Sequence, residues 1–291
     1  MRLVRPRHAF HALRVWKATP VQPMSGFANI SPVKTLAKEP AGRHANLFSV
    51  AGKTALITGG GSGICASMAR TLSDAGAQIL LVGRREDHLR DVLGDRGGAV
   101  FPLDLGADGA ATKLADAVHA AGFSPDIIIN AAGVNPRRHA DDIDEATWRA
   151  TVHLNLNVPF LVAQAFVPKM QKRGWGRIIN IASLQSNRAF QNGIAYGAAK
   201  GGILQLTRAM AEALSHHGIT ANAIAPGFFP TALTAAVFDN QALTDQYARQ
   251  TAIGRNGRLE DLDGPLLFLA SDASSYVTGQ NLPVDGGFTA K

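Results

Sequence analysis

From Phe48 to Lys291, short apolar runs alternate with stretches of helical periodicity, and this alternation limits the possible folds more than any other feature. The runs are rich in Ile, Leu and Val, as expected of strands that are buried on both faces. Strands are predicted at 54–58, 78–82, 99–101, 126–130, 177–182, 220–224 and 281–284. Helices are predicted up to 75, then at 86–93, 111–121, 146–171, up to about 216, and at 259–270, with an irregular segment at 228–256. This order predicts a single doubly wound (Rossmann-type) α/β domain, with a seven-stranded parallel sheet flanked by helices.

The formal charge of +7 is concentrated at the amino terminus. Residues 1–38 hold seven of the 29 Lys and Arg residues and none of the 22 acids, so the remainder carries 22 charges of each sign. A neutral body argues against nucleic-acid binding. Residues 1–47 are therefore interpreted as a basic extension to a 48–291 domain. The extension resembles an Arg-rich transit peptide, but a disordered leader and a translation start at Met24 are equal alternatives. We expect a cytoplasmic protein, or a mitochondrial matrix protein if the extension is a transit peptide.

Other partners are also excluded by composition. No apolar run approaches the ~18 residues of a membrane span, so no membrane partner is expected. Cys65 is the only cysteine, and the nine histidines form no ligand-like cluster, so neither a disulfide framework nor a metal site is predicted.

A glycine-rich turn, Thr58-Gly-Gly-Gly-Ser-Gly-Ile64, follows the first predicted strand and opens a helix. Glycines let the backbone approach a pyrophosphate, whose charge is favoured by the free amides of a helix N-terminus. The second strand ends in Gly83-Arg84-Arg85, with no acid for the ribose hydroxyls of NAD. Because arginine accommodates a 2′-phosphate, NADP is the preferred cofactor and NAD the alternative.

Tyr196 and Lys200 are four residues apart in a helical segment, so they share one helix face. A nearby cation favours the phenolate, so Lys200 is predicted to bring the pKa of Tyr196 toward working pH, as a general acid/base requires. Ser183 ends an apolar run, which predicts a hydroxyl at the carboxyl edge of the sheet that can polarise a carbonyl.

These motifs, in this order, resemble the short-chain dehydrogenase/reductase family over nearly all of 48–291. The resemblance implies a catalytic tetrad of Asn155, Ser183, Tyr196 and Lys200. It also implies that Lys200 holds the nicotinamide ribose and that Asn155 anchors a water leading to solvent. The predicted cofactor-binding residues are Thr58, Gly59, Gly61, Ser62, Gly63, Ile64, Arg84, Asp104, Asn130, Ala131, Gly133, Tyr196, Lys200, Pro226, Gly227 and Thr231.

One position departs from the family pattern: Cys65 stands where the motif has its last glycine. A side chain must then fit between helix and strand. A reactive thiolate at the helix N-terminus is one interpretation, and a small buried apolar residue is the favoured one.

The substrate is less constrained by sequence. Arg137 and Arg138 can pair with a carboxylate, and Gln185 is a further candidate contact. Three segments resemble the gluconate 5-dehydrogenase branch, namely Asn-x-Arg-Arg at 135–138, Arg255-Asn-Gly257 and the ending 284–290. This resemblance implies a sugar acid such as gluconate or 5-ketogluconate. The alternatives are a 3-oxoacyl-carrier-protein reductase and a protein that binds NADP without catalysis. Residues 228–256, with Phe228, Phe229 and Phe238, are predicted to form the substrate loop. A homotetramer is expected, with apolar positions along 203–214 facing a partner.

Overall fold

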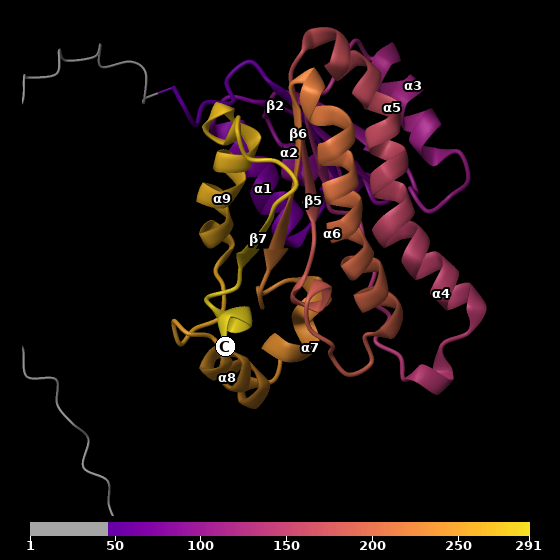
Figure 1. Ribbon diagram of the computed structural model, residues 1–291. Coiled ribbons are helices and arrows are strands. Elements are labelled where there is room, and N and C mark those ends of the chain that lie inside the picture. The colour runs from indigo at the N-terminus through magenta and orange to yellow at the C-terminus, as the bar shows by residue number, and fades with distance from the viewer. Residues whose placement is uncertain (1–45) are drawn as a thin grey trace, which may run out of the picture. The chain divides into compact units, whose positions relative to one another are not determined.

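Seven parallel strands form one sheet in the order β3-β2-β1-β4-β5-β6-β7, in a computed structural model that describes residues 46–291 (Figure 1). The predicted fold class is therefore confirmed. The strands are β1 Thr54–Thr58, β2 Gln78–Gly83, β3 Gly98–Pro102, β4 Ile127–Asn130, β5 Gly176–Ile181, β6 Ile219–Pro226 and β7 Asn281–Val284. The predicted runs correspond to these seven strands to within two residues at each end.

The central strands are apolar throughout because helices cover both faces of the sheet. Along β1, Ala55 and Ile57 pack into one core layer, whereas Leu56 packs into the other. The first layer receives side chains from α1 Gly63–Asp74, α2 Glu86–Leu93 and α9 Asp263–Ala270. The second layer receives them from α3 Ala110–Ala120, α5 Val158–Arg173 and α6 Ile194–Leu214, on the other side of the sheet in Figure 1.

The predicted long helix at 146–171 is interrupted. It consists of α4 Glu145–Val152, a π-helical turn at His153–Asn157, and α5. By length and composition alone, Glu145–Arg173 could cross a bilayer, so the expectation of no such run does not hold. Val162, Phe166 and Met170 are buried in the second core layer, however, which identifies α5 as a core helix of this fold.

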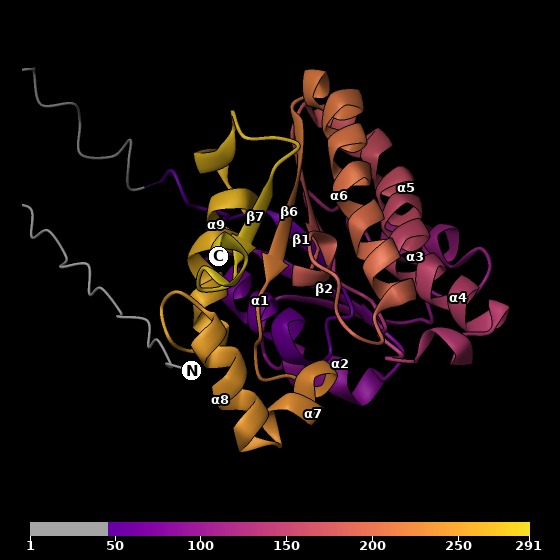
Figure 2. The ribbon, with the colours of Figure 1, turned by 60° about the horizontal axis from the view of Figure 1, so that its bottom comes forward.

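The segment 228–256 is not irregular as predicted. It contains α7 Ala235–Phe238 and α8 Gln241–Gln250, which lie at the carboxyl end of the strands in both views (Figures 1 and 2). Thr231 and Asn240 begin its helical turns, and the side chain of Asn240 accepts a hydrogen bond from the amide of Leu243. These caps were visible in the sequence, but few apolar positions marked the helices that follow them.

One sequence interpretation changes with the structure. Ile203, Leu204, Met210 and Ala211 are buried within the chain itself, so they do not need the partner that was expected to cover them. Near the start of the described residues, the carbonyl of Leu47 accepts a hydrogen bond from the amide of Ala273 at 3.0 Å. The 1–45 part of the predicted extension lies outside the described residues.

The strand order places a crevice at the carboxyl edge. From β1 the chain builds outward through β2 and β3, then crosses back to pair β4 on the other side of β1. Ligands of doubly wound sheets bind where the strand order reverses in this way. The loops after β1, β4, β5 and β6 all reach this edge.

Candidate active site

A cavity of about 570 Å³ opens at this edge, between the loops that follow the strands. Most of the residues predicted from sequence line it. They are Gly59, Gly61, Ser62, Gly63, Ile64, Arg84, Asp104, Ala131, Gly133, Arg137, Asn155, Ser183, Gln185, Tyr196, Lys200, Pro226, Gly227 and Thr231. The fold thus gathers eight separate segments of the chain around one space.

The glycine turn shapes one end of the cavity. Gly59 has a φ of 72°, and a β-carbon there would lie 3.1 Å from the Cα of Ala132, so only glycine fits without strain. Ser62 caps α1 without a side-chain hydrogen bond, which leaves the first amides of the helix for another acceptor. These residues fit a pyrophosphate, because free amides at a helix N-terminus bind such an anion.

Two arginines line the neighbouring part of the cavity. Arg84 and Arg85 follow β2 and are exposed, and the side chain of His88 lies beside them. Asp104 faces the same region, where its carboxylate accepts a hydrogen bond from the amide of Gly106 at 2.9 Å. The positive charges of Arg84 and Arg85 fit a 2′-phosphate better than two ribose hydroxyls. The sequence pointed to the pair Arg84-Arg85 and singled out Arg84, but it missed His88, which lies on the first turn of α2 and follows no motif.

Tyr196 and Ser183 meet on the opposite part of the cavity. Tyr196 lies on α6 and is buried, and this burial raises the pKa of its phenol. A hydrogen bond with Ser183 and the positive charge of Arg137 oppose the effect and lower the pKa. Ser183 is fixed in turn by accepting a hydrogen bond from the amide of Gln185 at 3.1 Å. The phenol and the hydroxyl can therefore act on the same substrate oxygen.

Lys200 does not act on Tyr196 as the sequence predicted. Its ammonium lies 5.6 Å from the centre of the Tyr196 ring and donates a hydrogen bond to the carbonyl of Ile181 at 2.6 Å. Burial lowers the pKa of Lys200 to about 8, while the nearby Cys65 opposes this shift. The pKa of Tyr196 is raised rather than lowered, because burial outweighs the charges around it. The cation that lowers the pKa of Tyr196 is that of Arg137.

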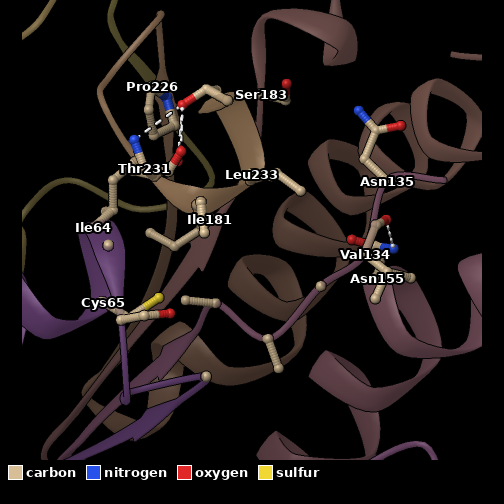
Figure 3. A pocket seen from close by; sticks show the side chains of 18 of the residues that line it. Ile64, Cys65, Val134, Asn135, Asn155, Ile181, Ser183, Pro226, Thr231 and Leu233 are labelled. Atoms are coloured by element: carbon tan, nitrogen blue, oxygen red, sulfur yellow. Dashed lines mark hydrogen bonds between the residues drawn. The ribbon is translucent and has the colours of Figure 1, made fainter. Parts of the chain in front are cut away.

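Asn155 occupies the π-helical turn between α4 and α5 and is fully buried. Its Nδ2 donates hydrogen bonds to the carbonyls of Val134 and Thr151, at 2.9 and 2.8 Å (Figure 3). Its Oδ1 has no partner among the described residues and packs against Gly133. The wide turn is what brings this amide into the cavity, in line with the frequent use of π-bulges at functional sites.

The comparisons with known proteins give a consistent assignment. A family model described as enoyl-(acyl carrier protein) reductase matches residues 59–289, which is most of the described chain. The chain belongs to the short-chain dehydrogenase/reductase family. The four residues predicted to form the catalytic tetrad all line the cavity: Asn155, Ser183, Tyr196 and Lys200.

Several relatives within this family are sugar-acid dehydrogenases by name. The gluconate 5-dehydrogenase of Gluconobacter oxydans is 37% identical over 257 residues, covering 84% of this chain and 98% of the relative. The 2-dehydro-3-deoxy-D-gluconate 5-dehydrogenase of Bacillus subtilis is 38% identical over 251 residues, covering 84% and 97%. A crystal structure of a gluconate 5-dehydrogenase from Burkholderia cenocepacia, in complex with NADP and tartrate, matches with a TM-score of 0.81 and 36% identity, covering 85% of this chain and 99% of that one.

Thr58 and Asn130, two of the predicted cofactor contacts, lie behind the cavity and do not line it. The hydroxyl of Thr58 accepts hydrogen bonds from the amides of Ala131 and Ala132, at 2.9 and 3.1 Å. Asn130 donates to Oδ1 of Asn180 at 2.9 Å. Both residues join neighbouring strands of the dehydrogenase fold at the edge where the loops begin, and thus position the residues that face the cofactor.

Cys65, the departure from the family pattern, projects its sulfur into the cavity from α1 (Figure 3). Burial raises the pKa of the thiol to about 11, although the charge of Lys200 lowers it. The thiol is therefore protonated at neutral pH, and the interpretation of a reactive thiolate is wrong. The alternative of a small, partly buried apolar residue agrees with its packing against the first core layer.

Arg137 and Arg138 lie in different environments in the structure. Arg137 lines the cavity, and its guanidinium donates a hydrogen bond to the carbonyl of Leu233 at 3.3 Å. Arg138 does not line the cavity, and its charge acts on Asp144 on the outside. A φ of 49° at Arg137 turns the two side chains in different directions. Of the two arginines predicted to bind a carboxylate, only Arg137 therefore stays a candidate.

The sequence predicted only part of the aromatic wall of the cavity. Phe228 stacks on Tyr247 of α8 with ring centroids 3.9 Å apart, and Phe190 approaches Phe228 at 6.2 Å. All three line the cavity. Phe229, predicted alongside Phe228, also lines the cavity while it packs into the first core layer, whereas Phe238 does not line the cavity.

Proposed function

We propose that this chain is an NADP-preferring oxidoreductase that interconverts a secondary alcohol and a ketone on a sugar acid, such as gluconate and 5-ketogluconate. One observation carries the proposal: Arg137 lies in the cavity of Tyr196 and Ser183, close enough for its charge to lower the pKa of the phenol. A cation beside the reacting hydroxyl favours an anionic substrate. The names of the relatives support a sugar acid as that anion.

Proton transfer is the task of Tyr196. In the oxidation direction its phenolate takes the proton of the substrate hydroxyl, while Ser183 hydrogen-bonds to the same oxygen. In the reduction direction the phenol returns the proton. Because burial raises the pKa of Tyr196, the protonated phenol prevails at neutral pH, and this is the form that donates the proton in the reduction direction. When bound, NADP supplies or accepts the hydride at its nicotinamide ring.

Four features of the chain support the cofactor assignment. The glycine turn and the uncapped amides of α1 accommodate the pyrophosphate, and Arg84 with Arg85 faces the 2′-phosphate. Lys200 is positioned to bind the nicotinamide ribose by exchanging its hydrogen bond to Ile181. Thr231, from the loop after β6, closes the cavity beside the glycine turn. Solved relatives from Beutenbergia cavernae and Burkholderia cenocepacia carry NADP.

A steady-state panel tests the whole proposal. NADPH and NADH are each combined with 5-ketogluconate, a neutral ketose and a 3-oxoacyl thioester, and kcat/KM is measured for all six pairs. We expect the highest value for NADPH with 5-ketogluconate. The thioester arm represents the second candidate, a 3-oxoacyl-carrier-protein reductase, which would share an acyl-carrier-protein substrate, but not the reaction, with the enoyl reductase after which the family model is described. A higher value for the thioester would replace our proposal, and no turnover in any arm would support ligand binding without catalysis.

Assembly and location stay proposals. Trp148 of α4 and Phe160 and Leu161 of α5 are large apolar residues exposed on one run of the chain, which supports a homotetramer. A native mass equal to four times 30.6 kDa would agree with this, and a 30.6 kDa species would contradict it. We also propose a cytoplasmic location, as for bacterial sugar-acid dehydrogenases that match 84% of the chain.

A further inference from the structure

Asn135 faces the cavity with a carboxamide whose oxygen is buried, and the proposed mechanism gives this residue no role. Its Oδ1 is shielded from solvent and has no hydrogen-bond partner among residues 46–291. The residue lines the same cavity as Ser183 and Tyr196. Leaving a buried oxygen without a hydrogen bond is unfavourable, so such a group in a binding cavity indicates a missing hydrogen-bond donor.

The position of Asn135 identifies which ligand supplies that donor. In Figure 3, Asn135 and Asn155 lie on one side of the cavity, and Ile64, Cys65 and Thr231 of the cofactor end lie on the other. Asn135 is also two residues before Arg137, on the loop that carries the carboxylate-binding cation. This loop thus faces the substrate between its reacting carbon and its acid group.

A second carboxamide occupies a corresponding place on another loop. Gln185 follows Ser183 by two residues, and its Oε1 is likewise buried, unpartnered in the described structure, and packed over Gly193. The reacting oxygen is therefore approached by Ser183 and Tyr196, with one carboxamide on each adjoining loop. A carboxamide offers both an acceptor and a donor, whichever way it is turned, and this matches an alcohol group, which is also both.

We propose that Asn135 is a specificity-determining residue that hydrogen-bonds to a hydroxyl of the substrate chain, so that the site selects polyhydroxylated acids over acids with a bare methylene chain. The inference rests on the proposed function, since it assumes that the substrate is an acid oriented by Arg137. A site that holds a buried polar group in this way rejects an analogue that lacks the matching hydroxyl, because the carboxamide then stays unpaired.

The test compares the wild-type chain and one variant on two substrates. Asn135→Ala and the wild-type chain reduce 5-ketogluconate and 5-oxohexanoate, which have the same carbon chain, ketone position and carboxylate but differ in their hydroxyls. We expect kcat/KM for 5-ketogluconate to fall roughly 10- to 100-fold in the variant, and that for 5-oxohexanoate to change less than about twofold. Asn135→Ser, which keeps a short donor and acceptor, should restore part of the loss.

Two further measurements make the result decisive. If 5-oxohexanoate is reduced too slowly to measure, the inhibition constants of gluconate and hexanoate against 5-ketogluconate reduction report the same preference for hydroxylated acids. In Asn135→Ala only the inhibition constant of gluconate should rise. NADP affinity should be unchanged in Asn135→Ala, as in Asn187→Ala, a matched control at an exposed asparagine outside the cavity. Equal losses for both acids, or none for either, would overturn the role of Asn135. Absence of wild-type activity on any acid would instead refute the proposed function.

Discussion

The two ends of the cavity are built by different means. At the cofactor end, the glycine turn and the first amides of α1 present backbone groups, and Arg84 and Arg85 add two exposed side chains. At the substrate end, Ser183, Tyr196, Arg137 and Asn135 reach in from loops and from α6 with their side chains. Binding at the first end is therefore a property of the fold, whereas chemistry and selectivity at the second depend on single residues.

This difference predicts where point substitutions act. A substitution at the substrate end removes one functional group and leaves the framework intact. At the cofactor end, a single side chain adjusts the preference between cofactors but cannot abolish binding, because the amides of α1 remain.

Tyr196→Phe gives the largest expected effect. The variant keeps the buried ring and loses the proton donor, so kcat should fall by at least ~100-fold while NADP binding is retained. Steady-state reduction assays measure kcat, and fluorescence titration with NADPH measures cofactor binding. Tyr276→Phe, at a fully exposed tyrosine, is the matched control and should behave as wild type. Near-normal turnover of Tyr196→Phe would contradict the mechanism.

Arg137→Ala should have an intermediate effect that is confined to acids. Loss of a charge-assisted contact of about 1.5–3 kcal/mol lowers kcat/KM for 5-ketogluconate roughly 10- to 150-fold and spares a neutral ketose. The neighbouring Arg138→Ala is the control, since Arg138 lies outside the cavity, and should change kcat/KM less than about threefold. If Arg138→Ala proved the more damaging of the two, the orientation of this loop in the substrate complex would differ from that described here.

Arg84→Ala should have the smallest effect. Arg84 is exposed, so its contact with a 2′-phosphate is weakened by solvent, and kcat/KM for NADPH should fall roughly tenfold. The value for NADH should stay the same, which a comparison of both cofactors at fixed substrate would show. An equal decrease for both cofactors would mean that Arg84 supports the fold rather than the phosphate.

The sequence predicted the framework from local signals, because apolar runs between glycines locate strands such as 126–130. The predicted catalytic tetrad rests on the family resemblance, and within it the spacing of Tyr196 and Lys200 predicts a common helix face. The alternation of strands and helices predicted a parallel sheet but not the order of its strands. Because the glycine turn follows the first predicted strand, its place at the edge of the sheet was also predictable.

The remaining features depend on contacts between distant segments. The hydrogen bond from Lys200 to the carbonyl of Ile181 depends on how α6 is placed beside the end of β5, which no spacing reveals. Arg137 and Arg138 are adjacent in sequence, and only the backbone angles of their loop separate them. Asn135 belongs to a segment that resembles the gluconate 5-dehydrogenase branch, but only its buried oxygen, without a partner among the described residues, indicates a role for it.

The backbone of Arg137 has a consequence for the adaptation of this protein to heat. A φ of 49° suits glycine, and an arginine there costs on the order of 1 kcal/mol. Arg137→Gly should therefore raise the melting temperature while it removes the cation that receives the acid. A laboratory lineage selected only for thermal tolerance would gain by this exchange, and its members would lose the preference for acids while they keep an intact tyrosine and cofactor site.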